Sequence, residues 1–169
     1  VVLGSVLAQP LFLRVLVGRL GLSPALVMSY MLGYHCDCMV AVTSADSFYE
    51  IALAKFPGDS PYMVAEVVTV TSFGGAEVIK RNVGIFYSVA PSIASVVRAF
   101  KNDQKKILPI SSLIDGVYEG LAGMTISLPC IVGKNGREGI VNPRLSEAEE
   151  GAFRNSFTVL TEAAVSVGL

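Results

Sequence analysis

The chain has 169 residues and a mass of 17.9 kDa, which suits one domain with a sizeable core and makes a second full domain unlikely to fit. Its formal net charge is −1 and only 16% of its residues are charged, so it lacks the basic field that attracts a nucleic-acid backbone. Hydrophobic residues make up 52% of the sequence and the mean hydropathy is +0.58. We therefore expect an apolar surface that a partner covers.

The apolar runs do not predict a membrane span. The longest charge-free stretches, 20–34 and 82–97, each contain a proline and are shorter than the roughly 18 residues that a span needs. The chain does not begin with methionine, and its first residues lack a basic leader. We expect a fragment of a longer protein, folded as a single mixed unit over residues 1–169.

The first half of the chain predicts a helix, two strands and a second helix. Apolar residues at helical spacing predict a helix over residues 9–20, ended by Gly21. Segments 25–35 and 39–45 are rich in residues that favour strands, and they place His35 at the end of the first strand. After a turn cluster at 56–61, residues 62–82 predict a long helix interrupted near Gly74 and Gly75.

The second half predicts a helix, three strands and a C-terminal helix. Residues 90–102 form an amphipathic pattern in which Pro91 suits a first helical turn. A strand is expected over 105–111, and a hairpin over 124–141 turns at 134–136, where Asn-Gly supplies positive φ angles. Ser146 and Glu149 have capping-box spacing and predict a helix over 147–165. The expected fold class is α+β, with antiparallel twisted sheets packed against long helices.

The stretch GYHCDC, residues 33–38, concentrates the reactive side chains. It holds the only histidine, His35, together with Asp37 and two of the three cysteines. Consecutive side chains alternate in direction on a strand, so these residues cannot all converge on a metal ion. A reactive thiol would need an adjacent base and an electropositive setting. A structural histidine and a general acid/base histidine both remain open on these observations.

The three cysteines are odd in number, and two of them are one residue apart, so they do not predict a disulfide framework. Cys130 stands alone in an apolar run. This pattern favours a reducing, intracellular compartment, and we expect a cytoplasmic protein.

Several segments in order resemble the C-terminal, substrate-binding domain of the NAD-dependent malate and lactate dehydrogenases. YMLGYHCDCMVAV is similar to the family's V-L-G-x-H-G-D-[ST], FGGAEVIK to its G-G-A-E-I block, and FYSVAPSIA to its F-Y-A-P-A-x-S segment. The segments at 105–118 and 126–156 resemble its closing strand, hairpin and final helix. The G-G-A-E sequence and the Met39-Val40 pair are more similar to the malate enzymes than to the lactate enzymes.

The resemblance implies an acid/base role for His35, which would exchange a proton with the substrate hydroxyl, and a supporting position for Asp37. It also implies an NAD cofactor and a small 2-hydroxy or 2-oxo acid as substrate. The partner that covers the expected apolar surface would be a second copy in a homo-oligomer or a missing N-terminal domain. Ser92 and Ser88 are the matches for a small hydroxyl of the family's substrate pocket. No G-x-G-x-x-G motif for a dinucleotide occurs in the chain, so the nucleotide-binding half is expected to be absent.

The chain departs from the family's L-D-x-A-R-F-R motif. The aspartate that orients the histidine corresponds to Ala8, the substrate-clamping arginine to Leu11, and the second arginine to Leu13. Arg14 stands one residue late and could substitute only through a register shift, because one residue turns a helical side chain by about 100°. The alternative is therefore a non-catalytic relative, or a redesigned scaffold, that keeps the fold and the assembly surfaces.

Overall fold

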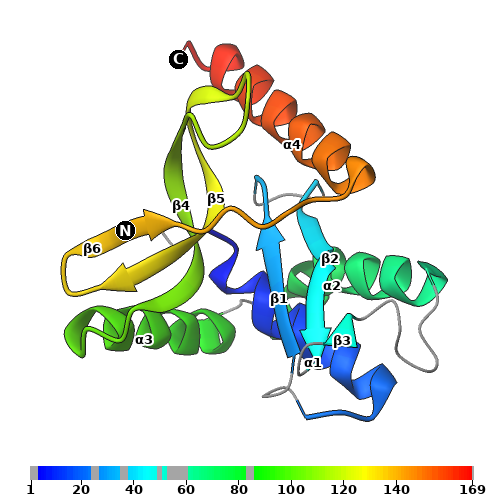
Figure 1. Ribbon diagram of the computed structural model, residues 1–169. Coiled ribbons are helices and arrows are strands. Elements are labelled where there is room, and N and C mark those ends of the chain that lie inside the picture. The colour runs from blue at the N-terminus through cyan, green and yellow to red at the C-terminus, as the bar shows by residue number, and fades with distance from the viewer. Residues whose placement is uncertain are drawn as a thin grey trace.

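The computed structural model describes residues 4–23, 27–34, 38–48, 51–52, 61–82 and 86–168 (Figure 1). Two three-stranded sheets organise them, and every pairing is antiparallel. The first sheet has the order β1 (Val27–Leu32), β2 (Val40–Phe48) and β3 (Ile51–Ala52), and the second has β4 (Lys106–Asp115), β5 (Ala122–Gly133) and β6 (Gly136–Ile140). An isolated bridge between Gly33 and Ser127 joins the end of β1 to β5.

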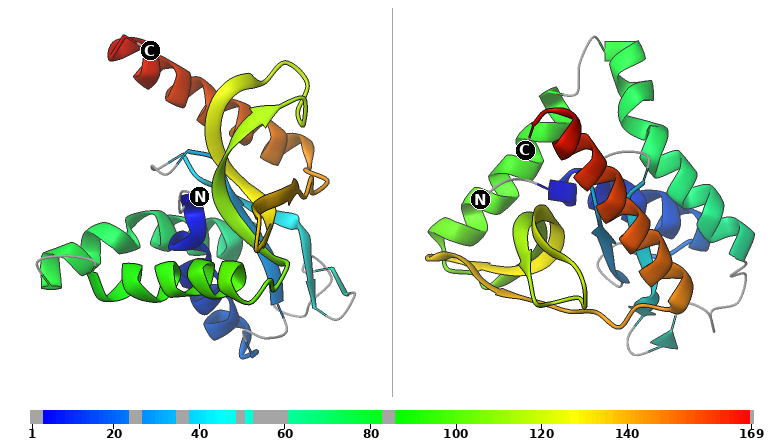
Figure 2. Two further views of the ribbon diagram at one scale, coloured as in Figure 1. Left: turned by 90° about the vertical axis from the view of Figure 1, so that its left-hand side faces the viewer. Right: turned by 90° about the horizontal axis from the view of Figure 1, so that it is seen from above.

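Four α-helices in the described chain pack around the sheets, after a short 3-10 helix η1 (Gly4–Val6). Helix α1 (Ala8–Leu20) contacts β1 and α2 (Pro61–Asn82), α3 (Phe86–Lys101) contacts β5, and α4 (Glu147–Ser166) contacts β2. Figure 2 shows α4 crossing above the strands, on the side away from α1. None of the described helices is long and apolar enough to cross a membrane.

The β1–β2 pair separates two apolar clusters. On one face, Met31 and Ala41 join the cluster formed with α1 and α2. On the other face, Leu32 and Val42 join the cluster that contains β4, β5, α3 and α4. Because successive side chains of a strand point to opposite faces, this alternation buries both faces of the pair. The strands that flank the GYHCDC stretch are therefore buried against two cores.

The main elements confirm the sequence predictions. Helix α1 ends at Gly21 with φ +68°, the left-handed conformation expected of a glycine C-cap. Ser146 and Glu149 form the complete capping box at the start of α4. The predicted fold class, antiparallel sheets packed against long helices, is also confirmed. The turn predicted at 56–61 lies outside the described residues except for Pro61.

Three local predictions are wrong. Helix α2 runs without interruption through Gly74, and the glycine allows the close approach of α1, since a Cβ there would lie 2.5 Å from Leu11 Cδ2. Pro91 lies inside α3 and not in its first turn, because the helix starts at Phe86 and Pro91 faces solvent. In the hairpin, Gly136 has φ +87° but Asn135 does not take a positive φ, so a single left-handed residue makes the turn.

Candidate active site

The connection between β1 and β2 is held at the point where it leaves β1. Gly33 N donates to Ser127 O at 3.1 Å, and Ser127 N donates to Gly33 O at 3.3 Å. Gly33 has φ +96°, which favours glycine over residues with a side chain. His35, Cys36 and Asp37 lie outside the described residues, so the predicted catalytic and supporting positions are known here only through the residues on either side of them.

Ser156 of α4 contacts both sides of that segment. Its side chain is fully buried, and its Oγ accepts a hydrogen bond from Tyr34 N at 2.8 Å. The same hydroxyl donates to Cys38 Sγ at 3.6 Å. A Cβ on Gly33 would lie 2.6 Å from Ser156 Oγ, so glycine is also needed there for the close approach of α4. One serine thus reaches the residue before His35 and the residue after Asp37.

Ser127 forms the opposite support. Its Oγ accepts from Ser5 N at 2.9 Å and donates to Pro109 O at 3.2 Å, and the residue is buried. Ser5 Oγ in turn donates to Met39 Sδ at 4.0 Å, just before β2. The N-terminal 3-10 helix, β4 and β5 therefore meet under Gly33 through backbone and hydroxyl hydrogen bonds.

Glu149 fixes α4 to β2. Its Oε1 accepts from Thr43 N at 2.8 Å and from Ser44 N at 2.9 Å, while its Oε2 accepts from Ser44 Oγ and from Ser146 N. Burial alone would raise the pKa of Glu149, but the hydrogen bonds from Ser44 and Ser146 outweigh burial and hold the pKa below its ordinary value. The carboxylate that caps α4 therefore also positions this helix against the strand that follows the GYHCDC stretch.

The start of α1 presents apolar side chains where the resemblance implies catalytic ones. Ala8 is 4% exposed and belongs to the core cluster of α1, β1 and α2. Leu11 packs against Gly74 of α2, as described above. The two positions assigned to the orienting aspartate and the clamping arginine thus hold apolar side chains, one buried in the core and the other at the α1–α2 contact.

The other predicted site residues lie on two helices. Arg14 is exposed on α1 and makes no hydrogen bond or ion pair with a described residue. Ser92 is buried on α3, and the side chain of Ser88, also on α3, lies outside the described part. Arg14 and Ser92 stand on helices that pack against different sheets.

The cysteines differ in state. Cys38 is disulfide-bonded, so the expectation that the cysteines form no disulfide framework does not account for Cys38. Cys130 is a buried free thiol whose pKa is raised by burial, an effect that the hydrogen bond with Ser112 opposes. Among the described residues, no group of three His, Cys, Asp or Glu could hold a metal ion.

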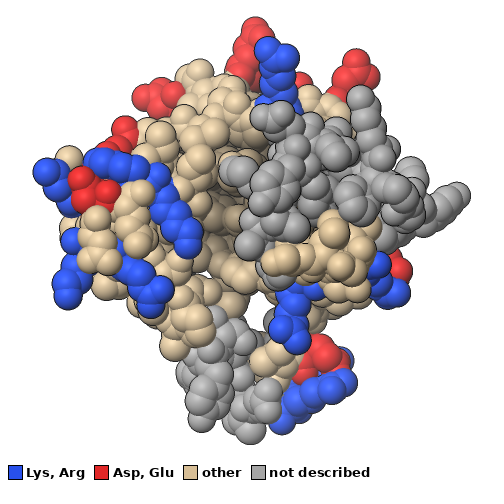
Figure 3. Space-filling model, turned by 60° about the horizontal axis from the view of Figure 1, so that its bottom comes forward, with Lys and Arg blue, Asp and Glu red and all other residues tan. Residues whose placement is uncertain are grey.

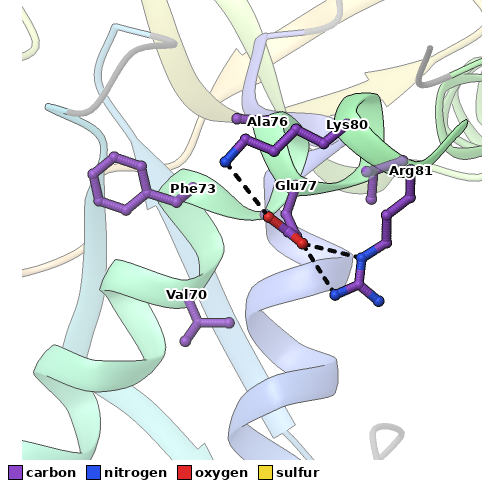
Figure 4. Close-up of a pocket in the computed structure, with 8 residues that line it drawn as sticks. Val70, Phe73, Ala76, Glu77, Lys80 and Arg81 are labelled. Atoms are coloured by element: carbon purple, nitrogen blue, oxygen red, sulfur yellow. Dashed lines mark hydrogen bonds and ion pairs between the residues drawn. The ribbon is translucent and has the colours of Figure 1, made fainter. Parts of the chain in front are cut away.

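A surface hollow lies along α2 (Figure 4). Glu77 is held there by Arg81 at 3.0 Å and by Lys80 at 3.8 Å, while Phe73 points to the other side. All of its lining residues belong to one helix, and none is a predicted site residue.

Sequence reasoning missed Ser127 and Ser156. Ser156 lies three residues after Phe153, so it shares the buried face of α4. A serine in that stripe was the available signal, because a buried hydroxyl requires a hydrogen-bond partner. Its partner is 122 residues away in the sequence, and no local pattern identifies it.

These features define a class of protein: an α+β domain of two antiparallel sheets, in which a C-terminal helix contacts the residues on either side of a histidine-bearing segment. The family model for the lactate/malate dehydrogenase, alpha/beta C-terminal domain matches residues 12–167. The chain therefore belongs to the lactate/malate dehydrogenase family and represents its C-terminal domain.

Relatives of both types match the chain. It is 32% identical to a malate dehydrogenase of Chlorobium phaeobacteroides, over 95% of this chain and 51% of the relative. It is 30% identical to L-lactate dehydrogenase 2 of Enterococcus faecalis, over 97% of this chain and 53% of the relative. The crystal structure of Cryptosporidium parvum malate dehydrogenase matches with a TM-score of 0.85 and 28% identity, over 93% of this chain and 51% of that one. The chain thus spans about half the length of these relatives.

Proposed function

We propose that this chain is the substrate-binding domain of an NAD-dependent 2-hydroxyacid dehydrogenase, most similar to the malate type, which interconverts malate and oxaloacetate, or lactate and pyruvate, in the complete enzyme. The observation that carries the proposal is the support of the β1–β2 connection. Ser127 holds its start, Ser156 contacts both sides of residues 35–37, and Glu149 ties α4 to β2. Fixed residues on either side of position 35 suit a side chain that must meet a substrate in one geometry.

His35 is the proposed acid/base group, with Asp37 in a supporting position. In oxidation it accepts the proton of the substrate hydroxyl, and in reduction it returns that proton to the substrate oxygen. Arg14 is the proposed cation for the substrate carboxylate. It follows Leu11 by three residues, so it lies within about 60° of the same helix face, and its guanidinium has no ion pair with a described residue. Ser88 and Ser92 are the proposed hydroxyl groups of the pocket.

NAD is proposed to bind outside the described residues. Their strand pairings are all antiparallel, whereas dinucleotides bind at parallel βαβ units. We therefore assign the cofactor to a separate domain of the complete enzyme, and this chain only to the substrate and its proton. A cytoplasmic setting belongs to the same proposal, although a disulfide at Cys38 is unusual in a reducing compartment.

A partner surface follows from α3. Ile93, Val97 and Phe100 are spaced by four and three residues, form one stripe along the helix, and are 46%, 54% and 47% exposed. A stripe of this kind favours burial against another protein surface. We assign it to the homo-oligomer contact or to the N-terminal domain of the complete enzyme.

The second candidate function is that of a non-catalytic relative which keeps the fold and its assembly surfaces. The packing of Ala8 and Leu11 favours it, because an orienting carboxylate and a clamping guanidinium are both replaced by apolar side chains in the α1–α2 contact region. Losing both groups should remove most of the transition-state stabilisation that they provide in an enzyme of this kind.

A fusion protein distinguishes the two candidates. In this fusion, residues 1–169 are joined to one half of the malate dehydrogenase of Chlorobium phaeobacteroides. That half is the one with no counterpart in this chain. The first candidate predicts oxidation of NADH with oxaloacetate or pyruvate above the rate of the fusion carrying His35→Asn. No turnover in the fusion, followed by turnover in its Ala8→Asp/Leu11→Arg variant, identifies a decayed enzyme. Absence of turnover in both proteins contradicts the dehydrogenase proposal and supports a remodelled pocket.

A further inference from the structure

The hydroxyl of Ser156 bridges two points of the chain that are close in sequence and separated by residues 35–37. It accepts from Tyr34 N at 2.8 Å and donates to Cys38 Sγ at 3.6 Å. Both partners belong to the β1–β2 connection, and the serine belongs to α4, more than 100 residues later. A hydroxyl can donate one hydrogen bond and accept two, so a single side chain is sufficient for this bridge.

The position of that hydroxyl is itself fixed. Ser156 is fully buried three residues after Phe153, which is also fully buried in the core. About two helical turns before Ser156, Glu149 accepts hydrogen bonds from Thr43 and Ser44 of β2. Helix α4 cannot turn or slide relative to the connection without breaking these contacts, so the bridge has little freedom.

Gly33 makes the bridge possible from the other side. A Cβ at this position would lie 2.6 Å from Ser156 Oγ and 3.3 Å from Ser156 Cβ. Any residue other than glycine would therefore push α4 away from Tyr34 N, besides adopting an unfavourable φ of +96°. Gly33 and Ser156 are therefore in direct contact, and the bridge depends on both residues.

We propose that Ser156 is a positioning residue for the acid/base histidine: its hydroxyl holds Tyr34 and Cys38, the described residues on either side of the segment that carries His35. The proposal rests on the function proposed above, in which His35 is the acid/base group. Ser156 acts through the backbone and does not itself contact the substrate.

The experiment uses the 169-residue chain, in which His35 is the only histidine, so that a single imidazole signal in an NMR spectrum belongs to it. In Ser156→Ala we expect this signal to move toward its position in the denatured chain, together with faster amide exchange of Tyr34. Thr161→Val is the matched control, because it removes a hydroxyl of the same helix whose one hydrogen bond within the described part of the chain is to Phe157 O. The control should leave both measurements unchanged.

Two further measurements keep the test decisive if Ser156→Ala does not fold. In the wild-type chain, the Tyr34 amide should exchange at least about tenfold more slowly than an unstructured amide. Gly33→Ala, which crowds the same hydroxyl, should move the His35 signal in the same direction as Ser156→Ala. An unprotected Tyr34 amide, or a His35 signal that neither variant moves, overturns the proposal.

The fusion protein separates this proposal from the proposed function. There, Ser156→Ala should lower kcat by about tenfold or more, the order expected for a displaced catalytic group, while KM for NADH is unchanged. If the fusion has no activity but the His35 signal responds to Ser156→Ala, the bridge stands and the dehydrogenase proposal is contradicted. If the fusion is active and Ser156→Ala has no effect on kcat, the positioning role is contradicted.

Discussion

At the scale of single residues, α4 meets the β1–β2 pair through two polar side chains that sit two turns apart. Glu149 accepts hydrogen bonds from the backbone of β2, and Ser156 accepts one from the backbone that follows β1. Both side chains are buried or nearly so. A buried donor left without its acceptor costs about 1–3 kcal/mol, so each of these residues is a sensitive point of the fold.

Glu149 should make the stability of the chain depend on pH in the acid range. Its pKa in the folded state is below the ordinary 4.5, so its contribution is fully present above about pH 4.5 and is lost as the pH falls through the lower, folded-state pKa. We expect Glu149→Gln to lower the free energy of unfolding at neutral pH by about 1–3 kcal/mol. The variant should also lose less stability than wild type on acidification.

Urea unfolding at several pH values measures this dependence. Glu147→Gln is the control, because Glu147 also carries an acidic group in the first turn of α4 but is exposed. Equal effects of the two substitutions would show that the helix N-terminus, and not the contact with β2, accounts for the stability.

Arg14 should bind the substrate carboxylate if the proposed function holds. Replacing it with glutamine in the fusion protein removes a charge-assisted hydrogen bond, worth about 1.5–3 kcal/mol, so KM for the oxo acid should rise by roughly ten- to a hundredfold. Arg19→Gln on the same helix, where the guanidinium is paired with Glu66, is the control. A KM that the two variants change equally would remove Arg14 from the site.

At the scale of elements, the sequence patterns predicted most helices and strands because local rules determine them. Gly21 ends α1 by its left-handed φ, and Ser146 starts α4 by capping its N–H groups. The local rules gave wrong predictions where a contact between residues far apart in the sequence determines the structure. Gly74 resembles a helix breaker in sequence, yet it serves the close approach of Leu11 from α1. In the sequence, Ser156 cannot be distinguished from other helical serines, because its contact with Tyr34 exists only in the folded chain.

Two glycines of the α1–α2 pair test this reading of Gly74. Alanine is favoured over glycine in a helix by about 1 kcal/mol, and a Cβ on Gly18 would meet nothing within 4 Å. We therefore expect Gly18→Ala to stabilise the chain by about 0.5–1 kcal/mol, whereas Gly74→Ala should gain less because its Cβ meets Leu11. The full gain at position 74 should return in a Leu11→Ala background. Equal gains for Gly18→Ala and Gly74→Ala in denaturant titrations would refute the close contact.

At the scale of the whole molecule, the apolar composition predicts a covered surface, and α3 supplies one candidate. Figure 3 shows charged side chains gathered toward the edge of one face, with uncharged residues between them. The stripe of Ile93, Val97 and Phe100 is the largest run of exposed apolar side chains on one face of α3. The sequence indicated that such a surface exists, but its location depends on which face of α3 packs on β5.

The stripe should take part in assembly. In the fusion protein, Val97→Glu should reduce the mass of the particle in analytical ultracentrifugation or expose more apolar surface to a fluorescent dye, because a buried unpaired charge is unfavourable. Arg98→Glu changes the charge at an exposed position roughly 100° further around the helix and should do neither. If Val97→Glu leaves both the mass and the dye binding unchanged, the stripe is not an interface.

The dependence of oxo-acid reduction on His35 tests the account most directly. In the active fusion, or in its Ala8→Asp/Leu11→Arg variant, kcat/KM for reduction should fall as the pH rises through the ionisation of a histidine, because the protonated imidazole supplies the proton. His35→Asn should lower kcat/KM by about a hundredfold or more and abolish that ionisation from the profile. Turnover that His35→Asn leaves at the wild-type level, with the same pH profile, would contradict the assignment of the β1–β2 connection as the active site.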